Sequence, residues 1–280
     1  MRSNNLSRTT TNDEFSEKDF YNKMDSANKA LEERRYEDSW NEFFELYSLK
    51  KSKVISKELC GEAAYGLCRV MKAIPINHQF IKQFIETDKE LVKKSKTRAV
   101  SNDYARKYIG RKYLVYAADD CNYYPAIEEY ALNCVGKGPK NSFVFEYNDQ
   151  DAEVGLHWAL KLLNSPDLNH QTVGYMVRAI YYFGRYRKTK SYLDADAFCD
   201  NVIEAKKLTE DTNEYQVYYY GHVCADPNFK NYKDGKYYNP KVGYEYFLRA
   251  REIVADPDLV ESANKIIVML ETKYPTMIEK

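Results

Sequence analysis

The sequence contains few of the residues that interrupt helices. It has 8 prolines and 11 glycines among 280 residues. A β-sandwich needs turn residues at intervals of about 8–12 positions, and this chain does not supply them. The shortage excludes an all-β protein and favours long helices.

Long apolar runs are also missing. No stretch approaches the ~18 consecutive apolar residues of a membrane-spanning helix. The opening Met1-Arg2-Ser3-Asn4-Asn5 lacks the apolar core of an export signal. We therefore expect no membrane span and no standard secretion, although a non-standard route stays open. The expected location is the cytoplasm.

The chain has no excess of either charge, with 42 Lys and Arg against 42 Asp and Glu. A neutral protein has no overall field that attracts a polyanion or an anionic membrane. Two short basic segments stand out, residues 93–98 and 185–190. Each predicts a solvated loop between helices, with contact to phosphates or to an acidic peptide as the alternative.

The cysteines form no paired motif, because none lies in the Cys-x-x-Cys spacing of zinc and redox sites. We expect buried, reduced thiols, as in a cytosolic protein, rather than a disulfide framework. The six positions are Cys60, Cys68, Cys121, Cys134, Cys199 and Cys224.

The polar residues indicate no metal site, no cofactor site and no catalytic residue. The acidic clusters at 149–153 and 194–200 lack the glycine and terminal glutamate of an EF-hand. Residues 136–140 lack the spacing of a phosphate-binding loop. No metal-ligand spacing joins the four histidines: His78, His157, His170 and His222.

The sequence does contain a succession of helix patterns. Ser16 and Ser101 stand at helix starts, and Pro125, Pro240 and Pro257 suit first turns. Residues 1–13 are polar and predict a flexible tail, and the one strand candidate, 142–145, is too short for a sheet. Periodicity predicts helices at about 16–31, 36–49, 57–73, 80–91, 101–116, 125–134, 152–163, 171–184, 194–207, 213–224, 240–254 and 257–273.

Two segments recur along the chain. Tyr181-Tyr182-Phe183-Gly184 returns 37 residues later as Tyr218-Tyr219-Tyr220-Gly221, and the segment around Gly155 returns 88 residues later around Gly243. Glycine costs about 1 kcal/mol in a helix interior, so its reuse predicts that another backbone passes close by. Recurrence of this kind is typical of stacked helix pairs.

Residues 35–43 resemble the turn and second helix of a tetratricopeptide repeat, with Ser39 where that family prefers alanine. Tyr220-Gly221 and residues 239–250 resemble a Sel1-like repeat, whose second helix carries a small residue, an aromatic and a late alanine. Gly243, Tyr246 and Ala250 stand at those places, but Tyr220 replaces the family's leucine. The resemblance implies a right-handed superhelix that acts as an adaptor and has no chemistry of its own.

The predicted fold is therefore all-α, a single α-solenoid of stacked antiparallel helix pairs over residues 14–280. First helices line the concave side of such solenoids, and the insert around Gly235 adds further aromatic side chains. We predict that the chain binds a protein or peptide there, with packing between repeats as the alternative for each tyrosine. The predicted contact residues are Arg178, Tyr182, Arg185, Tyr186, Tyr215, Tyr219, Phe229, Tyr232 and Tyr237.

Two other functions stay open. A nucleic-acid binder would use the two basic segments, and its affinity would fall steeply with salt. An all-helical enzyme would need polar residues that converge in a closed pocket. The residues to watch for such a pocket are His157, Cys134 and Asp119.

Overall fold

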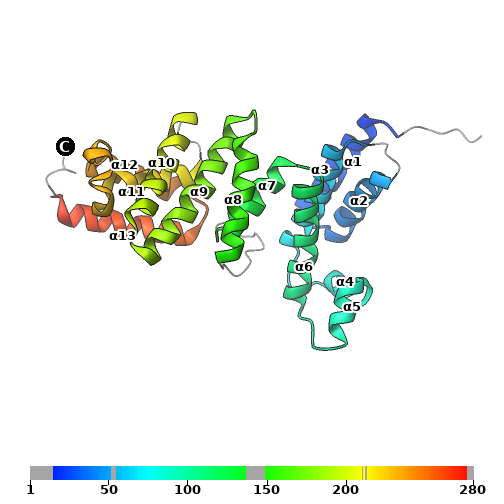
Figure 1. Ribbon diagram of the computed structural model, residues 1–280. Coiled ribbons are helices and arrows are strands. Elements are labelled where there is room, and N and C mark those ends of the chain that lie inside the picture. Colours follow the sequence, from blue (N-terminus) through cyan, green and yellow to red (C-terminus); the bar gives the residue numbers. More distant parts are fainter. Residues whose placement is uncertain (1–14, 52–54, 137–148, 210, 212, 276–280) are drawn as a thin grey trace, which may run out of the picture.

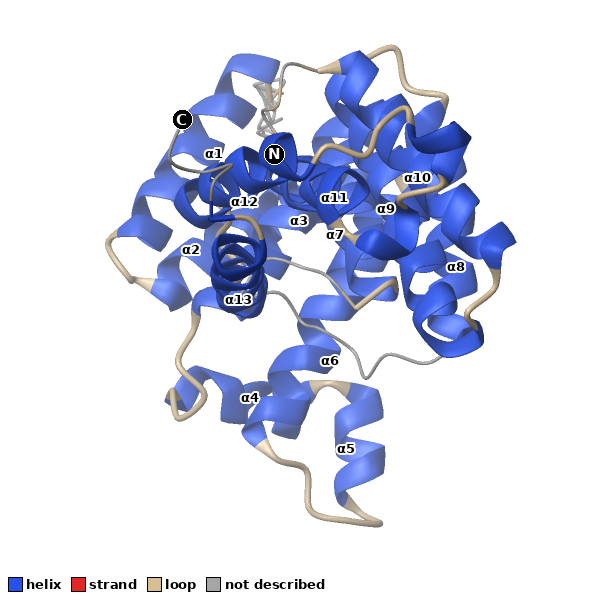
Figure 2. Cartoon of the chain, turned by 90° about the vertical axis from the view of Figure 1, so that its left-hand side faces the viewer, coloured by secondary structure: helices blue, strands red, loops and turns tan. Residues whose placement is uncertain are grey.

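The computed structural model describes residues 15–51, 55–136, 149–209, 211 and 213–275, which form an all-helical protein (Figure 1). No strand occurs in these ranges, which confirms the predicted all-α class (Figure 2). The predicted tail and the strand candidate at 142–145 lie outside the described residues. None of the described helices combines the length and the apolar character needed to span a bilayer.

Helices follow one another with short connections. In chain order they are α1 (Glu17–Glu32), α2 (Tyr36–Ser48), η1 (Leu49–Lys51), α3 (Lys57–Ala73), α4 (Gln79–Thr87), α5 (Lys89–Ser95), α6 (Asn102–Val115), η2 (Tyr116–Asp120), α7 (Tyr124–Cys134), α8 (Asp149–Leu163), α9 (Leu168–Thr189), α10 (Tyr192–Leu208), α11 (Glu214–Ala225), η3 (Pro227–Phe229), η4 (Tyr232–Gly235), α12 (Pro240–Ile253) and α13 (Pro257–Lys273). Of the short elements, η2 is a π-helix and the others are 3-10 turns.

The helix starts follow from capping chemistry. The Ser16 hydroxyl accepts a hydrogen bond from the backbone N–H of Asp19, and the Asp19 carboxylate accepts one from the Ser16 N–H, which makes a capping box. The Ser101 hydroxyl caps α6 by accepting a hydrogen bond from the backbone N–H of Tyr104. Pro240 and Pro257 occupy first turns behind asparagine and aspartate caps. These predicted starts are confirmed.

Helices pack mainly against their neighbours in the sequence. Contacts join α1 to α2, α7 to α8, α9 to α10 and α11 to α12, and α13 lies against α12. The helices form an elongated row, with α1 and α2 near one end and α12 and α13 near the other (Figure 1). The core is correspondingly long, and its buried side chains run from Phe20 to Leu270.

One helix pair is interrupted. Helix α3 packs on α6, and the intervening α4 and α5 project from the row as an arm, here called the α4–α5 arm (Figures 1 and 2). The predicted single helix over 80–91 is wrong. Asp88 ends α4 in an extended conformation, and its side chain caps α5 by accepting from the N–H groups of Glu90 and Leu91.

Helix α9 is longer than the pattern indicated. It continues through Gly184 to Thr189 and ends at Lys190, whose φ of 57° is left-handed. Residues 185–189 are therefore the end of a helix, and the predicted loop is wrong there. Arg187 and Lys188 lie in the last turn, where positive charge is favourable next to the unpaired carbonyl groups. Lys93 and Lys94 occupy the same position at the end of α5.

The recurring glycines lie where helices approach closely, as predicted. A Cβ at Gly243 of α12 would lie 2.4 Å from the Cβ of Ala225 and 3.0 Å from its backbone nitrogen in α11. A Cβ at Gly155 of α8 would lie 3.3 Å from the carbonyl oxygen of Ala131 in α7. The segments related by 88 residues therefore share a contact with the preceding helix.

A buried ion pair joins the first helices to the rest of the row. Glu129 of α7 is 4% exposed. Its Oε2 accepts hydrogen bonds from Lys72 Nζ at 2.6 Å and from Tyr65 Oη at 2.8 Å, both on α3. Burial, followed by the neighbouring carboxylate, raises the pKa of Tyr65, so its hydroxyl keeps its proton and donates.

Candidate functional site

The structure places several predicted contact residues in the core. Tyr215 and Tyr219 of α11 are 4% and 3% exposed, and Phe229 and Tyr232 of the insert are 3% and 7% exposed. A side chain that is buried to this degree packs within the protein and offers little surface to a partner. We therefore remove these four from the set of candidate contacts.

The insert after α11 is folded against the core. The Phe229 ring lies 5.0 Å from Phe198 and 5.5 Å from Tyr186, measured between ring centroids. The Tyr232 hydroxyl donates to Asp200 Oδ1 at 2.6 Å, and half-buried Tyr237 lies 5.7 Å from the Tyr232 ring. The length of this segment is thus explained by the aromatic core that it completes.

Four predicted residues remain accessible on α9. Arg178, Tyr182 and Tyr186 are half-buried, and Arg185 is exposed. Arg185 Nε lies 3.3 Å from Asp194 Oδ1, so its charge is already partnered by α10. These residues do not converge on one described cavity.

A pocket of about 380 Å³ does open between α9, α11 and α13. The Tyr219 side chain forms part of its wall, and Gly184 and Arg187 of α9 line the opposite side. The Tyr218 hydroxyl donates to Ser262 Oγ at 2.8 Å across it. The lining of this pocket combines apolar side chains with charges of both signs, Arg187 and Lys188 of α9 and Asp258 of α13.

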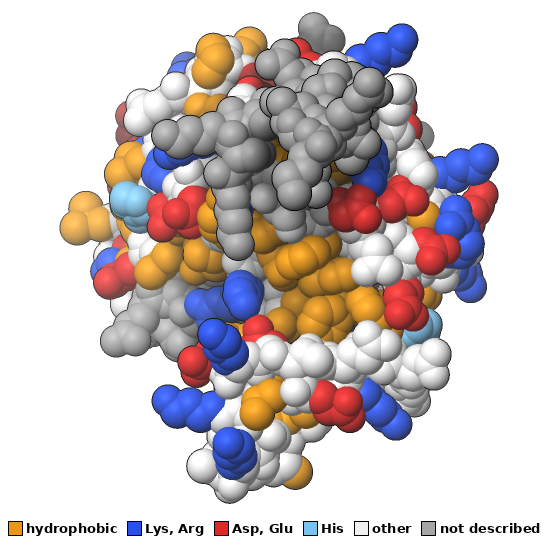
Figure 3. All heavy atoms as spheres, turned by 90° about the vertical axis from the view of Figure 1, so that its right-hand side faces the viewer, with side chains coloured by type: hydrophobic (Ala, Val, Ile, Leu, Met, Phe, Trp, Pro, Cys, Tyr) orange, Lys and Arg blue, Asp and Glu red, His pale blue; other side chains and the backbone are white. Residues whose placement is uncertain are grey.

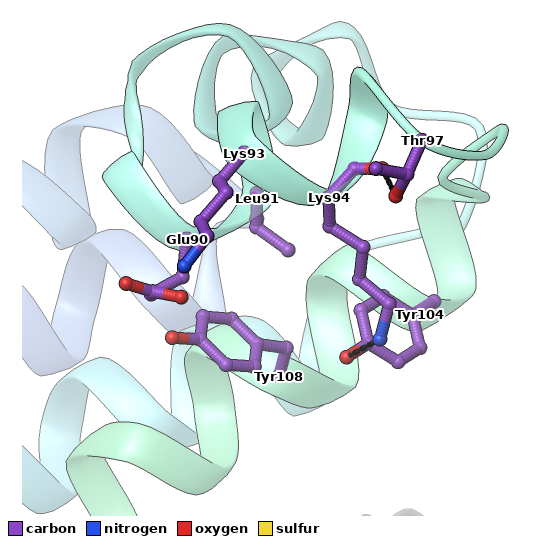
Figure 4. A pocket seen from close by; sticks show the side chains of 7 residues that line it. All are labelled: Glu90, Leu91, Lys93, Lys94, Thr97, Tyr104 and Tyr108. Carbon is purple, nitrogen blue, oxygen red and sulfur yellow. Dashed lines mark hydrogen bonds between the residues drawn. The ribbon is translucent and has the colours of Figure 1, made fainter.

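A second pocket, of about 330 Å³, lies between α5 and α6 in the arm (Figure 4). The rings of Tyr104 and Tyr108 stack at 6.3 Å. Lys94 Nζ lies 3.8 Å from the centroid of the Tyr104 ring and hydrogen bonds its hydroxyl. Glu90 lines the same pocket. The basic segment at 93–98 is thus partly engaged by tyrosine and lies beside a carboxylate.

A group of aromatic side chains with an exposed member lies where the arm meets α2. The rings of Trp40 and Phe44 stack at 6.5 Å, Trp40 lies 4.8 Å from Phe84 and 5.4 Å from Tyr113, and Tyr47 lies 5.2 Å from both Tyr113 and Tyr116. Figure 3 shows hydrophobic side chains gathered in a hollow at this end of the molecule. We call the following set the aromatic hollow: Trp40, Phe44, Tyr47, Phe84, Tyr113 and Tyr116.

The ring in the middle of the hollow is buried, and a ring at its edge is exposed to solvent. Trp40 is 6% exposed, whereas Phe44 is 43% exposed. A rigid aromatic cluster with an exposed member is the composition that protein interfaces favour, because aromatic rings supply contact area and lose little conformational entropy. A single exposed phenylalanine is normal on a protein surface. An exposed phenylalanine that extends a packed aromatic cluster is instead typical of an interaction site.

Lys50 stands at the rim of the hollow. Lys50 Nζ lies 3.7 Å from the ring centroid of Tyr47 and 4.4 Å from that of Tyr116. Burial raises the pKa of Tyr113 and of Tyr116, so both hydroxyl groups are neutral donors at physiological pH. The hollow therefore presents an apolar floor with hydroxyl groups and one positive charge.

The three residues considered for an enzyme differ in burial. His157 and Asp119 are exposed, and Cys134 is buried. None of the three lines the pockets described above. Among the described residues, no three His, Cys, Asp or Glu side chains are grouped as metal ligands would be.

Sequence reasoning did not find the aromatic hollow as a site. Its rings come from residues 40–47, 84 and 113–116, and only the folding of α2, α4 and α6 brings them together. The available signal is the run of aromatic residues within 36–49, part of which lies in the segment that resembles a tetratricopeptide repeat. Comparison with known proteins adds no family: no family model, no curated protein and no solved structure matches the chain.

Proposed function

We propose that this protein is a non-enzymatic scaffold that binds a protein partner in the aromatic hollow. The observation that supports the proposal most strongly is Phe44, an exposed ring stacked on a buried tryptophan within a fixed aromatic cluster. The partner's contact segment would carry an apolar or aromatic anchor for the hollow. A carboxylate beside that anchor would pair with Lys50 at the rim.

We propose further that the helix pairs form an α-solenoid related to Sel1-like and tetratricopeptide repeats. Packing between sequence neighbours supports this idea, as does the shared glycine contact of α8 and α12. The buried Ser39 hydroxyl donates to the carbonyl of Ala27 at 2.8 Å, which accounts for a serine where the tetratricopeptide family prefers alanine. Adaptors of this architecture act through their surfaces.

A cytoplasmic location is part of the same proposal. All six cysteines lie in the described part of the chain, are buried and are free. Buried free thiols are typical of reducing compartments, where disulfides do not persist. This feature supports a protein that works among cytoplasmic partners.

The test compares two exposed aromatic residues. Phe44 is 43% exposed and lies in the hollow, whereas Tyr21 is 46% exposed and lies on α1 outside it. Partners are first captured from the native lysate with wild-type bait, and the purified partner is then titrated against each variant by calorimetry. Because a hot-spot ring contributes about 2 kcal/mol or more to affinity, we expect Phe44→Ala to weaken binding at least tenfold and Tyr21→Ala to leave it unchanged.

Thermal melting distinguishes binding from folding in the same variants. Both rings are substantially exposed, so both alanine variants should melt close to the wild type. Suppose that Phe44→Ala and Tyr21→Ala both bind the partner as tightly as the wild type, and that Arg187→Ala loses binding. The partner would then lie in the pocket between α9, α11 and α13. That outcome would overturn the assignment to the hollow.

A further inference from the structure

Two cysteines meet beneath the aromatic hollow. Cys60 lies in the first turn of α3, and Cys121 directly follows the π-helix η2. The backbones are close here, because a Cβ at Gly61 would lie 2.8 Å from the Cβ of Cys121. Cys60 directly precedes Gly61, so the two cysteines lie on facing backbone segments. The pair is 3% and 7% exposed.

The two thiols differ in acidity. The hydrogen bond with Cys121 lowers the pKa of Cys60 against the opposing effect of burial, and the Tyr116 hydroxyl and the Lys50 charge lower it further. The Tyr116 Oη lies 3.5 Å from Cys60 Sγ. The hydrogen bond with Cys60, followed by burial, raises the pKa of Cys121. Cys60 is therefore the thiolate of the pair, and Cys121 keeps its proton.

Cys68, Cys199 and Cys224 differ from Cys60 in acidity. Burial raises the pKa of Cys68 and of Cys199, so both remain neutral thiols in the core. Burial also raises the pKa of Cys224, to about 11. Thiolates react with oxidants and thiols do so slowly, so Cys60 combines the nucleophilic form with a second cysteine on the facing backbone.

We propose that Cys60 and Cys121 form an oxidative modification site that closes to an intramolecular disulfide when a hydroperoxide reaches it. The Cys60 thiolate attacks one peroxide oxygen, the O–O bond breaks, and the leaving oxygen takes a proton to give water or an alcohol. Cys60 is then a sulfenic acid. The Cys121 sulfur attacks the Cys60 sulfur, the S–O bond breaks, and water leaves with the Cys121 proton. In total, two thiols are oxidised and one hydroperoxide is reduced.

The disulfide would act next to the aromatic hollow. It would tie the start of α3 to the end of η2 and remove the thiolate that pairs with Tyr116. A π-helix is a strained local form that often marks functional positions, and η2 supplies both Tyr116 and the backbone that leads to Cys121. The modification site stands independently of the proposed partner binding.

The test treats the full-length protein with hydrogen peroxide, blocks the remaining thiols under denaturing conditions and maps peptides by mass spectrometry without reduction. We expect one linked peptide pair joining Cys60 to Cys121, the loss of two blockable thiols and a higher melting temperature. Dithiothreitol should reverse all three changes. The matched control Cys68→Ser should form the same link.

Single variants report the order of events. Cys121→Ser should stop at a sulfenic acid on Cys60, which dimedone traps, and Cys60→Ser should leave Cys121 unoxidised at the same peroxide dose. A circular dichroism spectrum confirms that each variant is folded. The proposal is overturned if peroxide leaves both thiols blockable in the wild type, or if the sulfurs become linked to cysteines other than each other.

Discussion

Replacing Glu129 tests whether the buried ion pair holds the first helices to the remainder of the row. The carboxylate accepts two hydrogen bonds from α3, one of them charged, and is 4% exposed. The Glu129→Ala variant removes the acceptor and leaves the Lys72 ammonium in a site where its side chain is only 13% exposed. Water cannot replace the lost partner without opening the contact between α3 and α7.

The expected cost follows from that uncompensated charge. Breaking a buried ion pair by removing one partner destabilises a protein by about 3–5 kcal/mol. Each kcal/mol lowers the melting temperature of a domain of 150–250 residues by about 2–4 °C. We therefore expect Glu129→Ala to melt about 6–20 °C below the wild type. The double variant Glu129→Leu with Lys72→Met should recover most of the loss, because it removes the charge together with its partner.

Scanning calorimetry and urea unfolding measure both quantities. The matched control is Glu261→Ala, which breaks an exposed pair with Lys265 on α13 and should leave the melting temperature unchanged, since exposed pairs contribute little. The reasoning would be refuted if Glu129→Ala melted with the control, or if the double variant were less stable than Glu129→Ala alone.

Three further expectations concern packing and acidity. Gly243→Ala should lose about 1–3 kcal/mol of unfolding free energy in urea titrations, because its new methyl would lie 2.4 Å from the Cβ of Ala225. Ser39→Ala should lose about 1 kcal/mol in the same assay, the net contribution of one buried hydrogen bond, and a larger loss would indicate repacking. Burial raises the pKa of Asp226, but hydrogen bonds, the largest from His222, outweigh it and lower the pKa overall. Its stabilisation should therefore be complete above the unfolded pKa of about 3.9 and fade as the pH falls below it. Melting curves from pH 3 to 7 should show a shallower acid limb for Asp226→Asn, and parallel limbs would contradict this account.

Local chemistry made much of the fold predictable. Three kinds of local feature could be predicted from the sequence, because each acts within one or two helical turns. They are the capping serines, the helix starts with a cap followed by proline, and the glycines at close helix contacts. Gly155 and Gly243 also indicated a contact between helices, because a residue without a Cβ has few other uses inside a helix. The helix at 57–73 was predicted to the residue from its apolar periodicity and from Pro75 beyond its end, and the structure shows Ser56 capping its start.

The sequence did not predict which helices pack against each other. The pattern of residues 79–95 predicts helices with one buried face, but it does not indicate which other helix covers that face. An arm and two further members of the row therefore look the same in sequence. The tyrosines failed for a related reason. Tyr215 and Tyr219 have an apolar body and a polar end, so a core position and a binding surface are equally compatible with the pattern. The burial of Tyr219 depends on packing from Phe183 and Phe198, which are distant in sequence.

The α4–α5 arm has a consequence for how this protein can change over generations. In a row where helices contact mainly their neighbours, a substitution in the arm affects α6 and α2 and little beyond them. The surface beside the arm can therefore diverge in shape and charge while the rest of the row stays under separate selection for folding. Such a division lets one protein acquire new partners by small steps, each neutral for its own stability.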